Sequence, residues 1–171
     1  MKIKEYMIRM NELKRPYITV SREHETDMVH ELSAKYSSSD KLVNGLKEIF
    51  DIESLTEEYV WMVCMTAAFQ IIGVFEIAHG SINSSVFNTR GILQRALLAN
   101  ATYIVVAHCH PSGYTDPSDK DIVVTKQLYD ACALMEIGLL DHIIIGCCEE
   151  TKYYSFKANQ IFETWEKGGT K

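Results

Sequence analysis

Two periodicities of apolar residues predict both helices and strands along this chain. Helical spacing is found in four segments, which are residues 25–36, 40–50, 89–100 and 118–136. Apolar and β-branched runs of strand length fill residues 59–69, 71–77, 103–107, 141–146 and 153–156. The order of these elements predicts an α/β fold, built as a single mixed β-sheet with flanking helices.

The same pattern divides the chain into three parts. Residues 1–50 are predicted to form a helical N-terminal extension that includes a short strand-like piece at Tyr17–Val20. Residues 51–157 carry the buried strands and are predicted to form the main domain. Residues 158–171 end in a Gly-Gly-Thr-Lys sequence and are expected to be a frayed tail. A length of 171 residues with 47% hydrophobic residues is sufficient for one domain with a sizeable core.

Composition narrows the classes of function. The formal charge is −6, with 23 acidic and 17 basic residues, which disfavours an extended nucleic-acid-binding surface. The five cysteines have no CxxC spacing, so we expect reduced thiols rather than a cysteine-type zinc site. The first residues resemble no signal peptide, and no apolar run reaches the ~20 residues that span a bilayer. A cytoplasmic protein without a membrane segment is predicted.

Candidate chemistry lies at the end of the apolar strand at 103–107. His108 and His110 follow that strand, and alternate residues of a strand point to the same side. Pro111 then ends the strand pattern, because proline has no N–H to donate. Two imidazoles are therefore expected side by side at the carboxyl end of a buried strand, where open α/β sheets bind ligands.

A carboxylate follows eleven residues later. Ser118 is a good helix N-cap and Asp121 stands three residues on, in the capping-box position. Two neutral imidazoles and one carboxylate, with water in the fourth place, are the typical ligands of a catalytic zinc ion. The pattern alone leaves a simpler interpretation open, in which the histidines bind nothing and Asp121 only caps its helix.

The spacing also resembles a known family. His108-x-His110-Pro111, six further residues and then Ser118-x-x-Asp121 match the JAMM motif at its fixed positions, and His110–Gly113 with Pro117-Ser118 resemble its RadC form. The similarity extends over roughly residues 50–157. It includes Gly80–Asn83, Arg90, Ala99–Ala101, Thr125, Asp141–Gly146 and Ser155. This resemblance implies a JAB/MPN fold, which has a cytidine deaminase-like architecture.

The resemblance also implies roles for individual residues. A Zn²⁺ ion would be held by His108, His110 and Asp121, and Ser118 would stabilise an oxyanion. A family glutamate that contacts the metal-bound water aligns with Glu58. Its neighbour Glu57 is the competitor, but it should face the other side of the strand.

The chain departs from the RadC pattern at two places. Cys109 stands where asparagine is usual, and strand alternation predicts that its side chain points away from the metal. Thr89-Arg90-Gly91 stands where the family often has Pro-Arg-Glu, so the family glutamate is lost. Tyr114 lies in the loop beside the predicted site, where either a substrate contact or simple exposure to solvent would fit.

Three functions are compatible with these residues. The first is a zinc-dependent metallopeptidase or isopeptidase that hydrolyses an amide bond in a protein or peptide, such as a ubiquitin-like tail. The second is a DNA-repair-associated RadC-like protein that binds DNA or acts as a metal-dependent nuclease, which the net charge disfavours. The third is a catalytically silent JAB interaction module, which the presence of all the expected site residues disfavours. The oligomeric state is not predicted.

Overall fold

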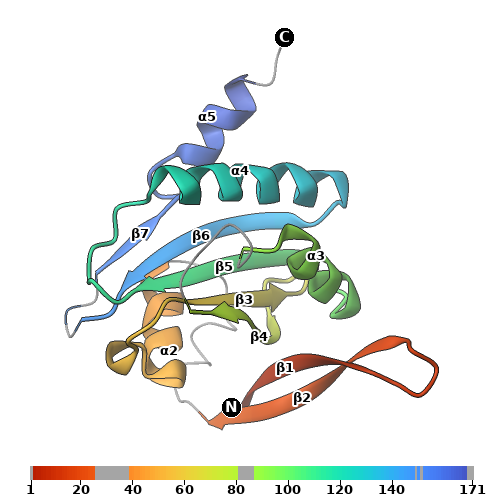
Figure 1. Ribbon diagram of the computed structural model, residues 1–171. Helices are drawn as coiled ribbons and strands as arrows, with labels where there is room; N and C mark the ends of the chain where they lie inside the picture. The colour runs from red at the N-terminus through yellow and green to blue at the C-terminus, as the bar shows by residue number, and fades with distance from the viewer. Residues whose placement is uncertain (1, 26–38, 81–86, 149, 151, 169–171) are drawn as a thin grey trace.

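A computed structural model of the chain describes residues 2–25, 39–80, 87–148, 150 and 152–168 (Figure 1). Its elements, in chain order, are β1 (Lys2–Met10), β2 (Pro16–Glu25), α2 (Ser39–Phe50), the 3₁₀ turn η1 (Ile52–Ser54), β3 (Tyr59–Met65), β4 (Ile71–His79), α3 (Thr89–Leu98), β5 (Tyr103–His110), α4 (Asp119–Leu134), β6 (Gly138–Gly146), β7 (Tyr153–Ser155) and α5 (Ile161–Gly168). The predicted helix at residues 25–36 lies almost entirely outside the described residues.

The described strands form one mixed sheet in the order β2-β1-β4-β3-β5-β6-β7. The central strands β3 and β5 pair antiparallel, whereas β5 and β6 run parallel. Helix α4 lies along one face of this sheet and α2 lies against the other (Figure 1). The predicted α/β fold with a single mixed sheet and flanking helices is confirmed.

Strand alternation divides the core into two layers. On β5, Ile104 and Val106 pack in the layer that contains buried residues of α3, α4 and α5. Val105, Ala107 and Cys109 pack in the opposite layer, which contains the buried residues of α2. The strand is therefore buried on both faces, as its continuous apolar sequence predicts.

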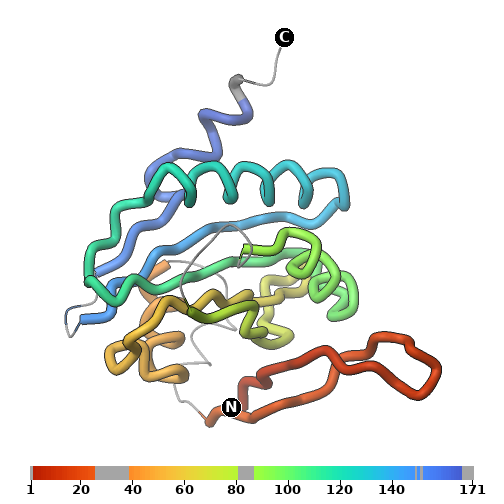
Figure 2. Tube along the Cα trace, viewed as in Figure 1, coloured from red at the N-terminus to blue at the C-terminus, as the bar shows by residue number. Residues whose placement is uncertain are grey.

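The N-terminal segment corrects a prediction. The predicted strand-like piece Tyr17–Val20 lies in β2, but the rest of residues 2–25 is not helical either and forms the antiparallel hairpin β1–β2; of the described extension only Ser39–Phe50 is an α-helix. Tyr6 fixes the hairpin to the sheet, since its ring lies 5.6 Å from that of Phe75 and occupies the space above Gly73. This long-range contact and the β-branched residues of β2 outweigh the weak local helical signal. Figure 2 shows the hairpin extending from the body of the molecule.

The tail is also more ordered than predicted. Instead of fraying, Ile161–Gly168 forms α5. Phe162 is buried, and the rings of Phe162 and Trp165 pack against Tyr129 of α4 at centroid distances of 5.1 and 5.6 Å. These apolar contacts explain why the segment is helical despite its small size. Within the described residues, no helix is long and apolar enough to cross a membrane.

Candidate metal centre

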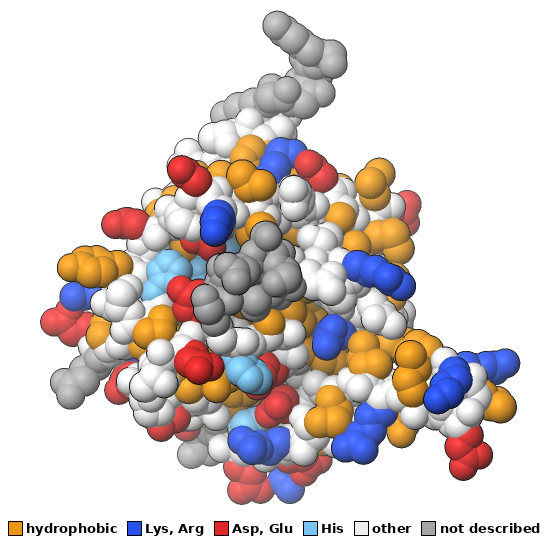
Figure 3. Space-filling view, in the orientation of Figure 1, with side chains coloured by type: hydrophobic (Ala, Val, Ile, Leu, Met, Phe, Trp, Pro, Cys, Tyr) orange, Lys and Arg blue, Asp and Glu red, His pale blue; other side chains and the backbone are white. Residues whose placement is uncertain are grey.

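The predicted ligands converge where β5 ends and α4 begins. The Nε2 atoms of His108 and His110 are 3.0 Å apart, and Asp121 Oδ1 lies 3.5 Å from His108 Nε2. A tetrahedral zinc ion with bonds of ~2.1 Å separates its ligand atoms by roughly 3.4 Å. The observed spacing therefore fits one such ion, and His108 and Asp121 are both buried. Figure 3 shows the face of the molecule that is turned toward the viewer in Figure 1, with histidine side chains in pale blue at separate places on its surface.

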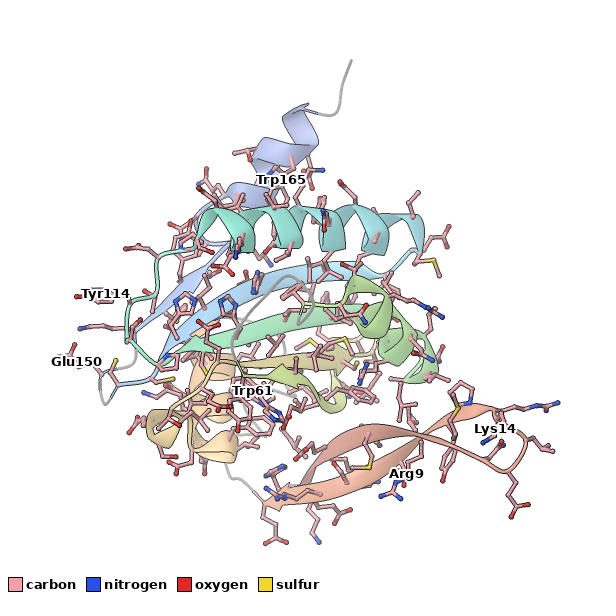
Figure 4. The ribbon with its side chains drawn as sticks, in the orientation of Figure 1. Arg9, Lys14, Trp61, Tyr114, Glu150 and Trp165 are labelled. Atoms are coloured by element: carbon pink, nitrogen blue, oxygen red, sulfur yellow. The ribbon has the colours of Figure 1, made fainter. Side chains whose placement is uncertain are left out.

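A hydrogen bond to the backbone determines which ring nitrogen of His110 carries the proton. Its Nδ1 lies 2.7 Å from the carbonyl oxygen of Tyr114, which can only accept. Nδ1 therefore carries the proton, and in the neutral ring Nε2 presents a lone pair toward His108 and Asp121. The Tyr114 side chain, in contrast, is 77% exposed and points away from the body (Figure 4).

A second set of hydrogen bonds orients His108. The Thr125 hydroxyl donates to the carbonyl oxygen of Asp121, so Thr125 Oγ1 accepts from Nδ1 of His142. Neutral His142 then accepts at Nε2 from Nδ1 of His108, at 2.8 Å. His108 is left with a lone pair on Nε2, the atom that faces the other ligands. We refer to Thr125, His142 and His108 as the imidazole chain.

Burial keeps the imidazole chain uncharged. Burial lowers the pKa of His108 to about 4, against the smaller raising effect of Asp121. Burial and the neighbouring histidines lower the pKa of His142 well below its usual value. Two imidazole lone pairs and a carboxylate oxygen thus point into one small space, which is repulsive unless a cation lies between them. The residues present fit a bound Zn²⁺ ion.

Removing the Thr125 hydroxyl is expected to weaken zinc binding. Thr125→Val leaves His142 free to place its proton on Nε2, which would push the His108 proton onto the nitrogen that should bind metal. We expect a loss in zinc affinity of about 10- to 100-fold, as for other groups that support metal ligands. Competition with a chromophoric chelator measures the loss. Thr125→Ser retains the hydroxyl and is the control; equal affinities in the two variants would contradict the imidazole chain.

Asp121 divides its two carboxylate oxygens between two tasks. Oδ2 accepts hydrogen bonds from the backbone N–H of Ser118 at 2.8 Å and from the Ser118 hydroxyl at 2.6 Å. The N–H of Asp121 donates in return to Ser118 Oγ, which completes the predicted capping box. Oδ1 remains directed at His108. The capping and metal-binding interpretations of Asp121 are therefore compatible.

Glu58 lies beside the ligand cluster. It precedes β3 and lines a cavity of about 270 Å³, which we call the polar cavity, together with His110, Ser112, Ser118, Lys120 and Asp121. Val60, two residues later, is paired with His108 and packs on the α4 side of the sheet. Strand alternation therefore directs Glu58 to the side of His108, while exposed Glu57 does not line this cavity.

Cys109 is directed away from the ligand cluster, as strand alternation predicts. It is buried in the layer with α2, and its sulfur accepts a hydrogen bond from the Tyr59 N–H at 3.4 Å. Burial raises the pKa of this thiol to about 12, so it is protonated at neutral pH. Cys109 is a packing residue in this structure, and Arg90 lies exposed on α3.

Sequence reasoning missed two features of the site. It left His142 open between a core residue and a residue that supports the site, and it did not connect His142 with Thr125 and His108, although Thr125 and His142 stand at positions that resemble the RadC family. It also missed a second, apolar cavity on the α4 side of His108, lined in part by Phe87 and Val123. No local pattern marks this cavity, because its walls come from separate parts of the chain.

The mixed sheet with helices on both faces defines an α/β domain of the JAB/MPN type, and the two imidazoles at a strand end and the carboxylate of the next helix form a cluster that could hold a metal ion. The RadC-like JAB domain family matches residues 36–161, and this chain belongs to that family. The matched segment contains all five predicted site residues.

Curated relatives agree with this assignment. A UPF0758 protein of Alkaliphilus oremlandii is 35% identical over 127 residues, which are 74% of this chain and 53% of the relative. A UPF0758 protein of Streptococcus suis is 36% identical over 126 residues, which are 74% of this chain and 49% of the relative. One of Haemophilus influenzae is 46% identical over 80 residues, covering 47% of this chain and 35% of the relative. The chain thus spans about half the length of the curated relatives it matches.

Proposed function

We propose that this chain is a zinc-dependent metallopeptidase that hydrolyses an amide or isopeptide bond in a protein or peptide. The observation that carries the proposal is the convergence of two imidazole lone pairs and a carboxylate oxygen beside a cavity that contains Glu58. Such a ligand set leaves a fourth position open, which is typical of catalytic rather than structural zinc.

The chain's own groups would supply the proton transfers. Bound zinc contributes a Lewis acid and a coordinated water whose pKa falls to about 7. Glu58 would accept the proton of that water and return it to the leaving amine from within the polar cavity. Ser118 would donate a hydrogen bond to the developing oxyanion. In this structure the Ser118 hydroxyl donates to Asp121 Oδ2, so the hydroxyl must rotate to reach an oxyanion. The backbone N–H of Ser118 would continue to donate to Asp121 Oδ2.

Glu58 and Ser118, the proposed acid–base and oxyanion groups, both line the polar cavity. Their presence favours hydrolysis over a catalytically silent interaction module. The test combines metal content with cleavage. We expect one zinc ion per chain and cleavage of a mixed peptide library, both lost with a chelator and restored by zinc; elemental analysis and mass spectrometry measure them. A zinc-loaded chain that cleaves no peptide but nicks DNA would refute the proposal in favour of a nuclease.

A further inference from the structure

A second cavity adjoins the ligand cluster on the side of α4. Its volume is about 310 Å³, and its walls are formed by the apolar side chains of Phe87, Val123 and Val124, by Asp119, Lys120 and Gln127 at positions of α4, and by the predicted ligands His108 and Asp121. We call it the apolar cavity. The volume is at the lower end of the range for ligand cavities, so it suits one side chain rather than a large cofactor.

Helical periodicity builds the apolar wall. Val123, Val124 and Gln127 lie at neighbouring positions on α4, and Val123 is 55% exposed. Phe87 approaches from the segment before α3 and is 6% exposed. An isolated exposed valine is unremarkable, but here it continues an apolar surface that starts at a buried phenylalanine and ends at the predicted metal ligands.

The two cavities meet at the ligand cluster. Asp121 and Lys120 line both of them, whereas Glu58 and Ser118 line only the polar cavity and His108 lines only the apolar one. A substrate whose carbonyl group is held at the metal would therefore extend into both cavities. Because Glu58 would return its proton to the leaving amine in the polar cavity, the apolar cavity is left for the acyl side of the scissile bond.

We propose that the apolar cavity binds an apolar side chain, of the size of leucine or methionine, on the acyl side of the scissile bond. This inference rests on the proposed hydrolytic function and specifies its substrate class. A polypeptide with such a residue fills the cavity, whereas a tail that ends in glycine leaves its apolar wall in contact with water. Substrates that present glycine there are therefore disfavoured.

Two pairs of small-molecule probes, each a leucine compound and its glycine counterpart, test the inference by their binding. On the zinc-loaded chain, N-acetyl-leucine hydroxamate should bind about 10-fold more tightly than N-acetylglycine hydroxamate, measured by calorimetry. In parallel, NMR of valine methyl groups, recorded with and without zinc, follows addition of N-acetyl-leucine methylamide or its glycine counterpart. The methyl signals of Val123 and Val124 should shift with the leucine probe and not with the glycine probe.

Two variants on the same helix turn sharpen the experiment. Val123→Ser should remove most of the leucine preference, because it replaces an apolar wall with a hydroxyl. Ile122→Ser introduces the same change one residue earlier; Ile122 is 37% exposed and does not line the apolar cavity, so this variant should retain the preference. Equal losses in both variants would overturn the inference.

The outcomes separate this inference from the proposed function. If the glycine hydroxamate binds the zinc-loaded chain and leucine gives no advantage, the apolar cavity is not a substrate subsite, while the metal centre stands. If neither hydroxamate binds but the Val123 methyl signals shift with the leucine amide, the cavity binds apolar side chains and the proposed metal chemistry fails. Absence of methyl shifts in both metal states overturns the inference directly.

Discussion

Asp121→Asn is expected to abolish zinc binding while leaving the fold intact. The asparagine oxygen can still accept hydrogen bonds from the Ser118 N–H and hydroxyl, and the N–H of residue 121 still donates to Ser118 Oγ, so the cap of α4 is retained. Its NH₂ group then stands where Oδ1 stood and donates to the lone pair of His108 Nε2. The substitution therefore exchanges a negative ligand for a hydrogen-bond donor that closes the site.

The expected loss of zinc affinity exceeds about 100-fold, the upper end for groups that only support a ligand. Zinc per purified chain and chelator competition measure it, and thermal unfolding of the metal-free protein measures the fold. Ser118→Ala is the matched control because it removes the capping side chain and no ligand. We expect it to cost about 1 kcal/mol of stability and to retain zinc. Stoichiometric zinc in the Asp121→Asn protein would exclude Asp121 as a ligand.

Local sequence patterns predicted the part of the site that depends on local geometry. Alternation along one strand placed His108 and His110 on one side and Cys109 on the other, because side-chain direction in a strand repeats every two residues. The capping box of Ser118 and Asp121 was equally predictable, since its hydrogen bonds join residues three apart. These features need no knowledge of how distant segments pack.

Features that depend on distant segments were not predictable from such patterns. Glu58 reaches the site because β3 pairs with β5 across some fifty residues, and only the family resemblance pointed to it. The imidazole chain joins α4 to β6, and the apolar cavity joins α4 to Phe87. Apart from the strand-like piece Tyr17–Val20, the hairpin at residues 2–25 was not predicted, because Tyr6 packs on Phe75 and Gly73, far along the chain.

Glu58→Gln is expected to leave zinc binding unchanged and to lower turnover by about 10²- to 10⁴-fold, the usual contribution of general acid–base catalysis. Glutamine has nearly the same shape and can still hydrogen-bond to water. It can neither accept a proton from that water nor deliver one to the leaving amine. Since Glu58 is not among the three convergent ligands, the metal should remain.

The neighbouring residue supplies the control. Glu57→Gln removes the same charge from an exposed side chain that does not line the polar cavity, so we expect zinc content and turnover close to those of the unaltered chain. Initial rates on a peptide cleaved by the zinc-loaded chain, with zinc measured on the same samples, compare the two variants. Similar losses in both would indicate a general electrostatic effect of the acidic surface. Full activity in Glu58→Gln would remove Glu58 from the mechanism, and the proton acceptor would then have to be another group in the polar cavity.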